Sequence, residues 1–563
     1  MMKRALLLVG LAVVFLASPA RAQAVGSCET GMAQRFLENR DLQVSLFNTG
    51  GLFFGGSTTS GDGYLIPKRD GNSPLFAAGL WLGGLIEGEM RIAGARYGGY
   101  DFWPGPLEDA ANPPEDCSDQ DRIYIVSRED IVHYYNTGEL TDDLRDWPHH
   151  LGAPVLDGDG DPTNYNLRAG DEPNLIGDVA AWWVMNDAGN DHNPGLPLGV
   201  EVRVHAFVYG RQGTVYSPVL SQTSFYRYEV VNRRDQPIEQ MYVTMFSDPD
   251  LGDAGDDYVG TDTLLNMVYV YNDSNEDAAY GTAPPAQGIQ ILQGLVGLAN
   301  GRDDDYDGIV DEPNEEMRAT SSGTFIGGGP NGTQDPGRPE GYYNSMQGLW
   351  PGGTPYYEYG TGFQQSESGA RTTRFVYAGD PVTESFWSEV NSDRQGTDNP
   401  PGDRRIVVST GPFRLMPDSS VVLLYAMPYG QGTDHLNSIA VMRGYATTLQ
   451  RVANNGAFVR SYRVRPPSDS GPGPALESPL LPTWVRPNPS SGSAQATLTL
   501  RSDAHVRATI TDVLGRQIDS IVDGVLPEGE TVLTMPDGLA PGIYRVRIEV
   551  QDVVKTLPFT MVR

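Results

Sequence analysis

Apolar and polar residues alternate clearly along one stretch of the chain. From Val200 to Val208, the apolar residues Val200, Val202, Val204, Ala206 and Val208 fall on one face. Successive side chains of a strand point to opposite faces, so a two-residue period is typical of a strand with one buried face. This stretch therefore predicts a strand that packs on a core.

Similar short runs occur elsewhere, separated by polar, turn-like segments. Residues 225–231 and 241–246 each predict a strand, and residues 405–410 and 419–426 predict a hairpin. Strands of this length and spacing favour an antiparallel, sandwich-like architecture. We expect residues 23–465 to form a large, mostly β region with few short helices.

Helical signals are few. Ser127, followed by Asp130 three residues later, is a capping-box-like start, and Gly138 is a typical stop. Residues 435–454 form the second helical pattern, with apolar residues at Leu436, Ile439, Met442, Ala446, Leu449 and Ala453. Packing on the core is the simplest interpretation of this stripe, and a partner-binding face is the alternative.

The first 22 residues are typical of a secretory signal peptide. Met1 to Arg4 is basic, Ala5 to Ala17 is apolar, and Ala20 and Ala22 are small residues at cleavage positions. A membrane anchor is the alternative, but the apolar run is shorter than the roughly 20 residues that span a bilayer. We expect cleavage before Gln23, and a mature protein that is not an integral membrane protein.

Residues 466–482 predict an extended linker, because the prolines that recur there lack a backbone donor. Residues 483–563 then show short alternating strands, which predict a small Ig-like β-sandwich. The alternating apolar positions are Ala494, Ala496, Leu498, Leu500, Val506, Ala508, Ile510, Tyr544, Val546, Ile548, Val550, Leu557, Phe559 and Met561.

Four motifs occur in order within residues 483–563. They are Pro487-Asn-Pro489, Asp512-Val-Leu-Gly-Arg516, Leu539-Ala-Pro-Gly-Ile-Tyr544 and a final Phe559-Thr-Met-Val-Arg563. The segment resembles the type A C-terminal sorting domain of type IX secretion cargo in Bacteroidetes and related bacteria. The resemblance implies transfer through the outer-membrane secretion machinery by way of the periplasm, followed by removal of the module. An ordinary Ig-like ligand-binding module is the alternative.

The large region also resembles uncharacterised cargo proteins of the same bacteria, and this resemblance implies no activity. The phrases that carry it are Gly79-Leu-Trp-Leu-Gly83, Trp182-Trp-Val-Met-Asn-Asp187, Ser247-Asp-Pro-Asp-Leu-Gly252 and Gly411-Pro-Phe413.

Charge narrows the range of partners. The chain has 72 acidic and 40 basic residues, which give a formal net charge of −32. Nucleic acids and anionic membranes are bound through basic side chains, so neither is expected as a partner. Cations are the expected partners of so acidic a chain. The two cysteines, Cys28 and Cys117, form either a disulfide or a pair of free buried thiols.

An Asp-rich segment gives the clearest signal for a ligand. Asp303, Asp305, Asp307 and Asp311 occupy positions 1, 3, 5 and 9 of a loop that has Gly308 at position 6. Alternating carboxylates on a tightly turned backbone are typical of calcium loops. Position 12 lacks the usual glutamate, so the segment is closer to the Asp-rich loops of extracellular proteins than to a calcium sensor. A solvated acidic turn is the alternative.

Two other segments carry weaker versions of this pattern. The first contains Asp157, Asp159 and Asp161. The second contains Asp248, Asp250 and Asp253 directly after a predicted strand, followed by Asp256, Asp257 and Asp262. Like charges at such density repel, and a bound cation relieves the repulsion. An acidic surface loop without a ligand is the alternative.

Signatures of familiar enzymes are absent from the sequence, including His-Glu-x-x-His, Gly-x-Ser-x-Gly and Gly-Lys-Ser/Thr. We therefore expect a secreted or cell-surface, non-enzymatic structural or adhesive protein with calcium-stabilised loops. The alternative is a protein that binds or cleaves a surface glycan or polysaccharide. It is suggested by Tyr342, Tyr343, Trp350 and the segment 356–359, whose rings either stack on sugars or pack under a loop.

Overall fold

The protein, described here by a computed structural model, divides into two compact units, Met1–Val464 and Arg465–Arg563. The described residues of the first unit are 25–54, 63–97, 99–193, 195–210, 217–296, 316–364, 369–456 and 458. Those of the second are 490, 494–500, 504–512, 516–527, 529–536, 538–540, 542–550 and 553–561. The predicted signal peptide, linker 466–482 and loop 303–311 lie outside these residues.

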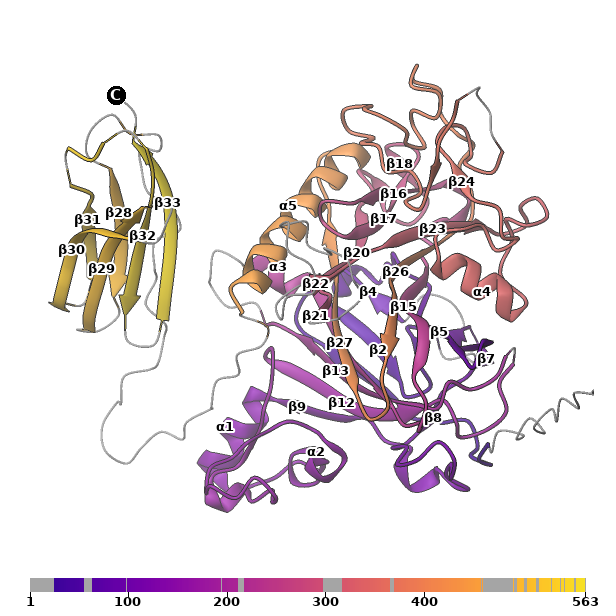
Figure 1. The fold of residues 1–563 in the computed structure, drawn as a ribbon, viewed down its shortest axis with the longest axis horizontal. Coiled ribbons are helices and arrows are strands. Elements are labelled where there is room, and N and C mark those ends of the chain that lie inside the picture. The colour runs from indigo at the N-terminus through magenta and orange to yellow at the C-terminus, as the bar shows by residue number, and fades with distance from the viewer. Residues whose placement is uncertain are drawn as a thin grey trace, which may run out of the picture. The chain divides into compact units, whose positions relative to one another are not determined.

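Two large antiparallel sheets form the first unit (Figure 1). The first sheet contains β1 (Gln34–Glu38), β2 (Gln43–Phe47), β3 (Gly51–Leu52), β4 (Tyr64–Leu65), β5 (Ala77–Ile86), β6 (Glu89–Arg96), β7 (Gly99–Tyr100), β15 (Ile238–Asp248), β23 (Ser321–Ile326) and β26 (Arg404–Leu415). The second contains β8 (Trp103–Pro104), β9 (Tyr124–Ser127), β12 (Val179–Asn186), β13 (Val200–Val208), β14 (Thr223–Asn232), β16 (Asp257–Asp262), β17 (Met267–Asn272), β20 (Ala286–Gln293) and β27 (Ser420–Gly430).

The main core lies between these sheets. It combines inward-facing residues of β5 and β15, such as Leu80 and Met245, with those of β13 and β27, such as Val204 and Leu423. All four of these side chains are fully buried. The predicted mostly β, sandwich-like region is therefore confirmed.

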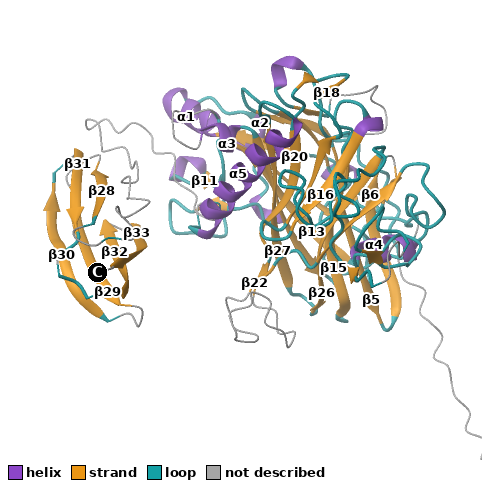
Figure 2. Cartoon of the chain, turned by 90° about the horizontal axis from the view of Figure 1, so that it is seen from above, coloured by secondary structure: helices purple, strands orange, loops and turns teal. Residues whose placement is uncertain are grey.

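Helices cover the outer faces of both sheets (Figure 1 and Figure 2). They are α1 (Arg128–Thr137), α2 (Asp142–Arg145), α3 (Ser217–Ser221), α4 (Pro339–Met346) and α5 (His435–Asn454). The predicted helix 435–454 is α5, and its apolar stripe packs on β17 and β20. α4 lies over the first sheet, where Tyr342 and Met346 pack on Trp81.

Short-range signals in the sequence are confirmed. The backbone N–H of Asp130 donates to Ser127 Oγ (3.0 Å) and the Asp130 carboxylate accepts from the Ser127 N–H (2.8 Å), which is the predicted capping box of α1. The strand Val200–Val208 has the predicted bounds. Its outer face is buried as well, because Phe207 stacks on Phe225 beneath the elements that cover the sheet.

The predicted hairpin of residues 405–410 and 419–426 is wrong. Both stretches are strands, β26 and β27, but they belong to different sheets. β26 pairs with β15 and β23, whereas β27 pairs with β14 and β20. Each strand has two neighbours in its own sheet, so the connection 416–419 crosses from one sheet to the other.

Four two-stranded ribbons complete the first unit. They are β10 (Val155–Leu156) with β11 (Glu172–Pro173), β18 (Glu276–Asp277) with β19 (Gly281–Thr282), β21 (Leu295–Val296) with β22 (Glu316–Met317), and β24 (Tyr356–Tyr357) with β25 (Thr372–Thr373).

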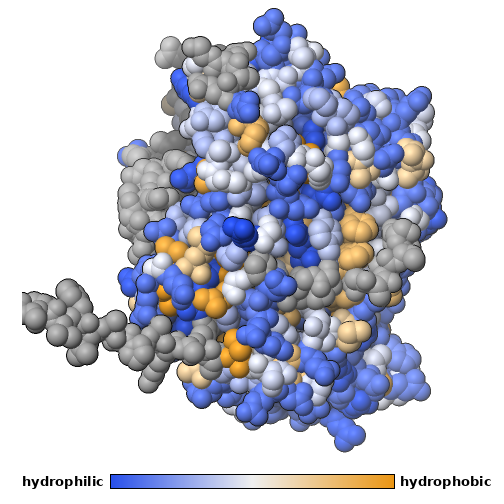
Figure 3. All heavy atoms as spheres, turned by 90° about the vertical axis from the view of Figure 1, so that its right-hand side faces the viewer, coloured by the Kyte–Doolittle hydropathy of each residue, from blue (hydrophilic) through white to orange (hydrophobic). Residues whose placement is uncertain are grey.

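On the face that Figure 3 shows, hydrophilic residues predominate and apolar residues lie in small, separate groups. None of the helices in the described residues is long and apolar enough to cross a membrane.

The second unit is a small β-sandwich, as predicted. One sheet pairs β28 (Gln495–Leu500) with β31 (Gly529–Thr534), and the other has the order β30 (Gln517–Leu526), β29 (Ala504–Asp512), β32 (Gly542–Val550), β33 (Val553–Met561). All the alternating apolar positions identified in its sequence lie in the core between these two sheets.

A disulfide between Cys28 and Cys117 ties the start of the described chain to the segment before β9. It is buried against Trp103, and the neighbouring backbone of Gly26 and Cys28 donates to the carbonyls of Ala188 and Gly189. Of the two states that the sequence left open, a disulfide or a pair of free thiols, the structure shows the disulfide.

We expect Cys28→Ala with Cys117→Ala to lower the free energy of unfolding by about 4 kcal/mol, because the bridge closes a loop of 89 residues and restricts the unfolded chain. Urea unfolding of the whole chain, followed by tryptophan fluorescence, measures this change. An unchanged midpoint would contradict it.

Candidate metal centre

Strand pairing brings together carboxylates that are distant in sequence. Ser247, near the end of β15, faces Ile406 of β26 in an antiparallel register. Continuing this register places Asp248 opposite Arg405 and Asp250 opposite Asp403. Carboxylate oxygens of Asp248, Asp250 and Asp403 lie within 4.8 Å of one another. We call these three residues the crossover cluster, because the chain leaves the first sheet here for β16 in the second.

The side chain of Arg405 pairs with two of these carboxylates. Arg405 Nε lies 3.2 Å from Asp248 Oδ1, and the same guanidinium pairs with Asp403. The Tyr97 hydroxyl donates to Asp248 Oδ2 (2.7 Å). Three carboxylates and one guanidinium leave a charge of −2 when all are ionised, which is the charge that a divalent cation neutralises.

Burial makes this charge costly. Asp248 is 2 % exposed. Burial and the neighbouring Asp250 raise the pKa of Asp248 to about 7. Burial and the neighbouring Asp403 raise the pKa of Asp250 to about 6. Both carboxyls therefore tend to take up protons near neutral pH in the absence of another positive charge.

A further carboxylate, Asp257, lies beside the crossover cluster at the start of β16. It is 1 % exposed, and one of its oxygens accepts from the Leu251 N–H (3.2 Å). Its other oxygen, Oδ1, has no hydrogen-bond partner among the described residues. Burial, reinforced by Asp250 and other nearby carboxylates, raises the pKa of Asp257 well above the usual value. A buried oxygen without a donor favours a cation nearby.

The membership of this site differs from the sequence-based grouping of Asp248, Asp250 and Asp253. Asp253 lies outside the crossover cluster: its carboxylate accepts from the Gly255 N–H (2.8 Å), and its own N–H donates to Asp277 (3.1 Å). Asp403 takes its place. No local pattern in the sequence marks Asp403, which is brought in by the pairing of β15 with β26.

A second acidic group forms around the β10–β11 ribbon. Oxygens of Asp157, Asp159 and Asp171 lie within 4.8 Å of one another. Asp171 is fully buried and accepts from the N–H groups of Gly158 (2.8 Å) and Asn166 (2.5 Å). Asp161, which the sequence grouped with the first two, instead accepts from the Thr163 hydroxyl (2.6 Å). Because backbone donors already satisfy both oxygens of Asp171 with hydrogen bonds, this group is the weaker candidate.

The predicted loop of Asp303, Asp305, Asp307 and Asp311 lies outside the described residues, so its ability to bind calcium stays a prediction.

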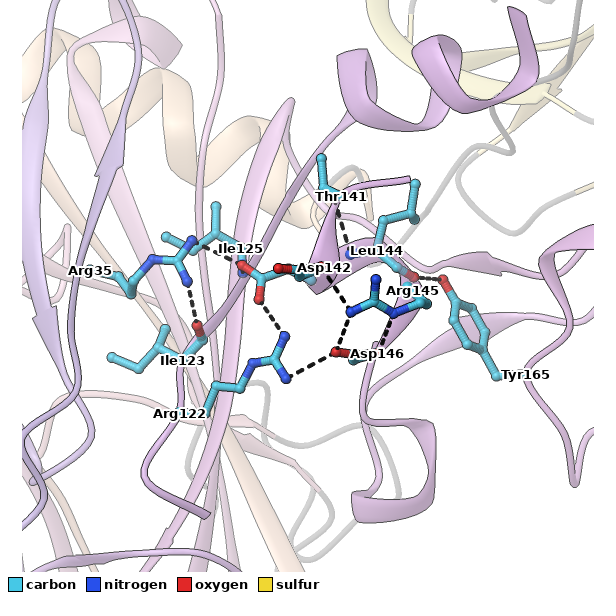
Figure 4. A network of polar contacts seen from close by, with 11 residues as sticks. Arg35, Arg122, Ile123, Ile125, Thr141, Asp142, Leu144, Arg145, Asp146 and Tyr165 are labelled. Atoms are coloured by element: carbon cyan, nitrogen blue, oxygen red, sulfur yellow. Dashed lines mark hydrogen bonds and ion pairs between the residues drawn. The ribbon is translucent and has the colours of Figure 1, made fainter. Parts of the chain in front are cut away.

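A cavity of about 700 Å³ lies next to α2 and is lined by arginines and aspartates (Figure 4). Asp143 accepts from Arg35 (2.9 Å), Arg122 (3.0 Å) and the Ile125 N–H (3.0 Å). Arg122 and Arg145 also share Asp146. These charges neutralise one another, and the network serves to fasten β1, β9 and α2 together.

The aromatic residues proposed as a sugar-stacking surface are mostly packed inside. Tyr342 and Tyr343 belong to α4 and pack against the first sheet. Trp350 and Tyr356 are at most 1 % exposed, with their rings 4.7 Å apart. The Trp350 indole N–H donates to the Gly362 carbonyl (3.1 Å). All four rings are buried, the first two between α4 and the first sheet and the other two in the main core, so they offer no surface to a sugar. In this segment only Tyr357 and Tyr359 are partly exposed.

Comparisons with known proteins leave the family open. No family model matches the sequence, and no curated protein matches it. A polysaccharide lyase of known structure aligns with a TM-score of 0.19 and 10% identity, over 65% of this chain and 34% of the lyase. The aligned region thus spans about a third of that protein, and a TM-score this low supports neither a shared fold nor a shared activity.

The raised pKa values predict how pH affects the metal-free protein. The pKa values of Asp248 and Asp250, about 7 and about 6, lie above the value of ~3.9 for an unfolded aspartate, so the folded state binds more protons between these limits. Their contribution to stability is therefore complete below about pH 4 and is lost as pH rises through 6 to 7.

We expect the melting temperature in EDTA to fall between pH 5 and 8, and to fall less in Asp250→Asn, which cannot ionise. Differential scanning calorimetry of both proteins at several pH values measures this difference. If the melting temperature falls equally with pH in the wild type and in Asp250→Asn, the raised pKa of Asp250 is wrong.

Proposed function

We propose that this chain is a secreted or cell-surface, non-enzymatic structural or adhesive protein whose large sandwich is stabilised by calcium at the crossover cluster. The observation that carries the proposal is the excess of carboxylate at the crossover cluster, where Arg405 pairs with Asp248 and Asp403 and three aspartates lie together. The unpartnered oxygen of Asp257 supports it further.

The donor set favours calcium over other metals. Every candidate ligand is a carboxylate oxygen, whereas zinc and copper sites use nitrogen or sulfur. Calcium accepts six to eight oxygens in flexible geometry, whereas magnesium demands a strict octahedron and retains water. Side chains from two strand ends and a loop, with water, suit the more tolerant ion. The Asp157–Asp159–Asp171 group and the loop 303–311 are additional calcium sites in this proposal.

The position of the crossover cluster supports a structural role. Asp248 and Asp250 follow β15, Asp403 precedes β26, and Asp257 begins β16 in the opposite sheet. An ion held here would neutralise the repulsion that otherwise opposes this crossing. Arg405 already occupies part of the site, which restricts access for a substrate.

The proposal also includes export. The Cys28–Cys117 disulfide is typical of proteins in oxidising compartments. In the proposed route, residues 1–22 direct the chain to the periplasm, and residues 483–563 engage outer-membrane secretion machinery as a removable sorting module. The compact second unit suits such a role, because a module with a core of its own can be recognised separately and removed by a single cut before it.

We expect EDTA to lower the melting temperature of the first unit and added calcium to restore it. An ion that binds only the folded state adds about 2.7 kcal/mol at a hundredfold excess over its dissociation constant. Asp403→Asn should weaken this response, whereas Asp119→Asn, at an exposed aspartate outside the cluster, should leave it unchanged. Calorimetry with and without calcium measures these melting temperatures. A wild-type melting temperature that EDTA does not change would refute the proposal.

The export route predicts a defined mature form. We expect the extracellular protein to begin near Gln23 and to end between Arg465 and Trp484. Deleting Phe559 to Arg563 removes the buried Phe559 and Met561 from β33, and should leave the protein in the periplasm. Intact mass spectrometry of the native protein tests this, and an extracellular species that still ends at Arg563 would show that the module is permanent.

A further inference from the structure

A cluster of unusual backbone conformations lies in the loops between β24 and β26. Tyr359, Phe386 and Arg394 all adopt the left-handed region, with φ values of 88°, 63° and 63°. For a residue with a side chain this conformation costs roughly 1–2 kcal/mol. Such outliers persist only where the surroundings hold them in place, and they gather at ligand-binding sites.

The side chains of these three residues meet. The guanidinium carbon of Arg394 lies over the rings of Tyr359 and Phe386, 4.5 Å and 5.0 Å from their centroids. Phe386 is 39 % exposed, Tyr359 is partly exposed and Arg394 is exposed. The contact therefore forms at the surface and adds little to any core.

The scaffold beneath these side chains is rigid. Asn391, which is 3 % exposed, donates through Nδ2 to the carbonyls of Phe386 (3.1 Å) and Glu384. The Gly360 N–H donates to the Ser392 carbonyl (2.9 Å), and the buried Trp387 indole donates to the Gly360 carbonyl (3.0 Å). The backbone next to each ring and next to Arg394 is thus fixed before any ligand arrives.

Arg394 differs from the arginines that stabilise the fold. Arg404 pairs with the buried Glu389 (2.9 Å), and Arg405 pairs with Asp248. Arg394, by contrast, has no hydrogen bond or ion pair with any of the described residues, although the chain has a large excess of acidic groups. Its N–H groups are unpaired among the described residues, and its guanidinium lies against the two rings.

We propose that Tyr359, Phe386 and Arg394 form a binding site for a uronate unit of an acidic polysaccharide. The planar guanidinium binds a carboxylate through two parallel hydrogen bonds. The exposed part of Phe386 offers an apolar surface to the C–H face of the sugar ring, which a simple acidic peptide lacks. In a chain with a net charge of −32, a carboxylate needs a local positive charge, which Arg394 supplies between the two rings. This site is separate from the crossover cluster and does not depend on it.

Trigalacturonate, titrated calorimetrically into the full-length protein in excess calcium, tests the site. We expect saturable binding that weakens about tenfold or more in Arg394→Gln, because a hydrogen-bonded charge pair is lost. Arg451→Gln, at an exposed arginine of α5, is the matched control and should bind as the wild type does. Maltotriose, which is neutral, should bind at least tenfold more weakly than trigalacturonate.

The variant Phe386→Gly distinguishes an effect on ligand binding from an effect on stability. Glycine adopts a positive φ without strain, so this variant should melt at the same temperature or higher, yet bind trigalacturonate several-fold more weakly. Equal binding by the wild type and Arg394→Gln, or the absence of binding by the wild type, would overturn the proposal. If triglutamate binds as tightly as trigalacturonate, the site recognises acidic peptides and the assignment to a sugar is wrong.

Discussion

Repulsion between carboxylates at one crossing point is the constraint on which the large unit depends. The chain must leave β15 at Asp248 and enter the opposite sheet at Asp257, and both of these side chains are almost completely buried. Among the described residues, Arg405 is the guanidinium that pairs with the crossover cluster, through Asp248 and Asp403. The remaining charge is removed either by protonation, which the raised pKa values of Asp248 and Asp250 favour, or by a cation. Calcium would allow the same fold to persist at neutral and alkaline pH.

The rest of the molecule is organised around the two sheets that this crossing connects. The chain passes from one sheet to the other several times, for example from β14 to β15 and from β26 to β27. The core between the sheets therefore draws on residues from many parts of the first unit. Helices and ribbons cover the outer faces, and the disulfide fastens the beginning of the chain. Because the core lies between the two sheets, the surface loops are the part of the unit in which we propose that a ligand binds. We place this site at three left-handed residues, Tyr359, Phe386 and Arg394.

The sequence predicted what depends on neighbouring residues and missed what depends on distant pairing. The alternation at Val200–Val208 and the capping box at Ser127 are local signals, and both are confirmed. The hairpin at residues 405–426 is wrong because proximity in the chain cannot say which sheet a strand joins. Asp403 and Asp171 were missed for a related reason, since each reaches its cluster only through tertiary structure. Arg394 was missed because a positive φ and a free guanidinium leave no mark on a one-dimensional pattern.

Anomalous diffraction from crystals of the full-length protein grown with calcium tests the central claim most directly. The account predicts a peak between Asp248, Asp250 and Asp403, with oxygen ligands at about 2.3–2.6 Å. It also predicts that Arg405 stays paired with at least one of these carboxylates. Crystals soaked in saturating calcium that show no anomalous peak there, while Asp248, Asp250 and Asp403 keep their carboxylate oxygens within 4.8 Å of one another, would contradict it. The crossing would then be stabilised by shared protons instead of a metal ion.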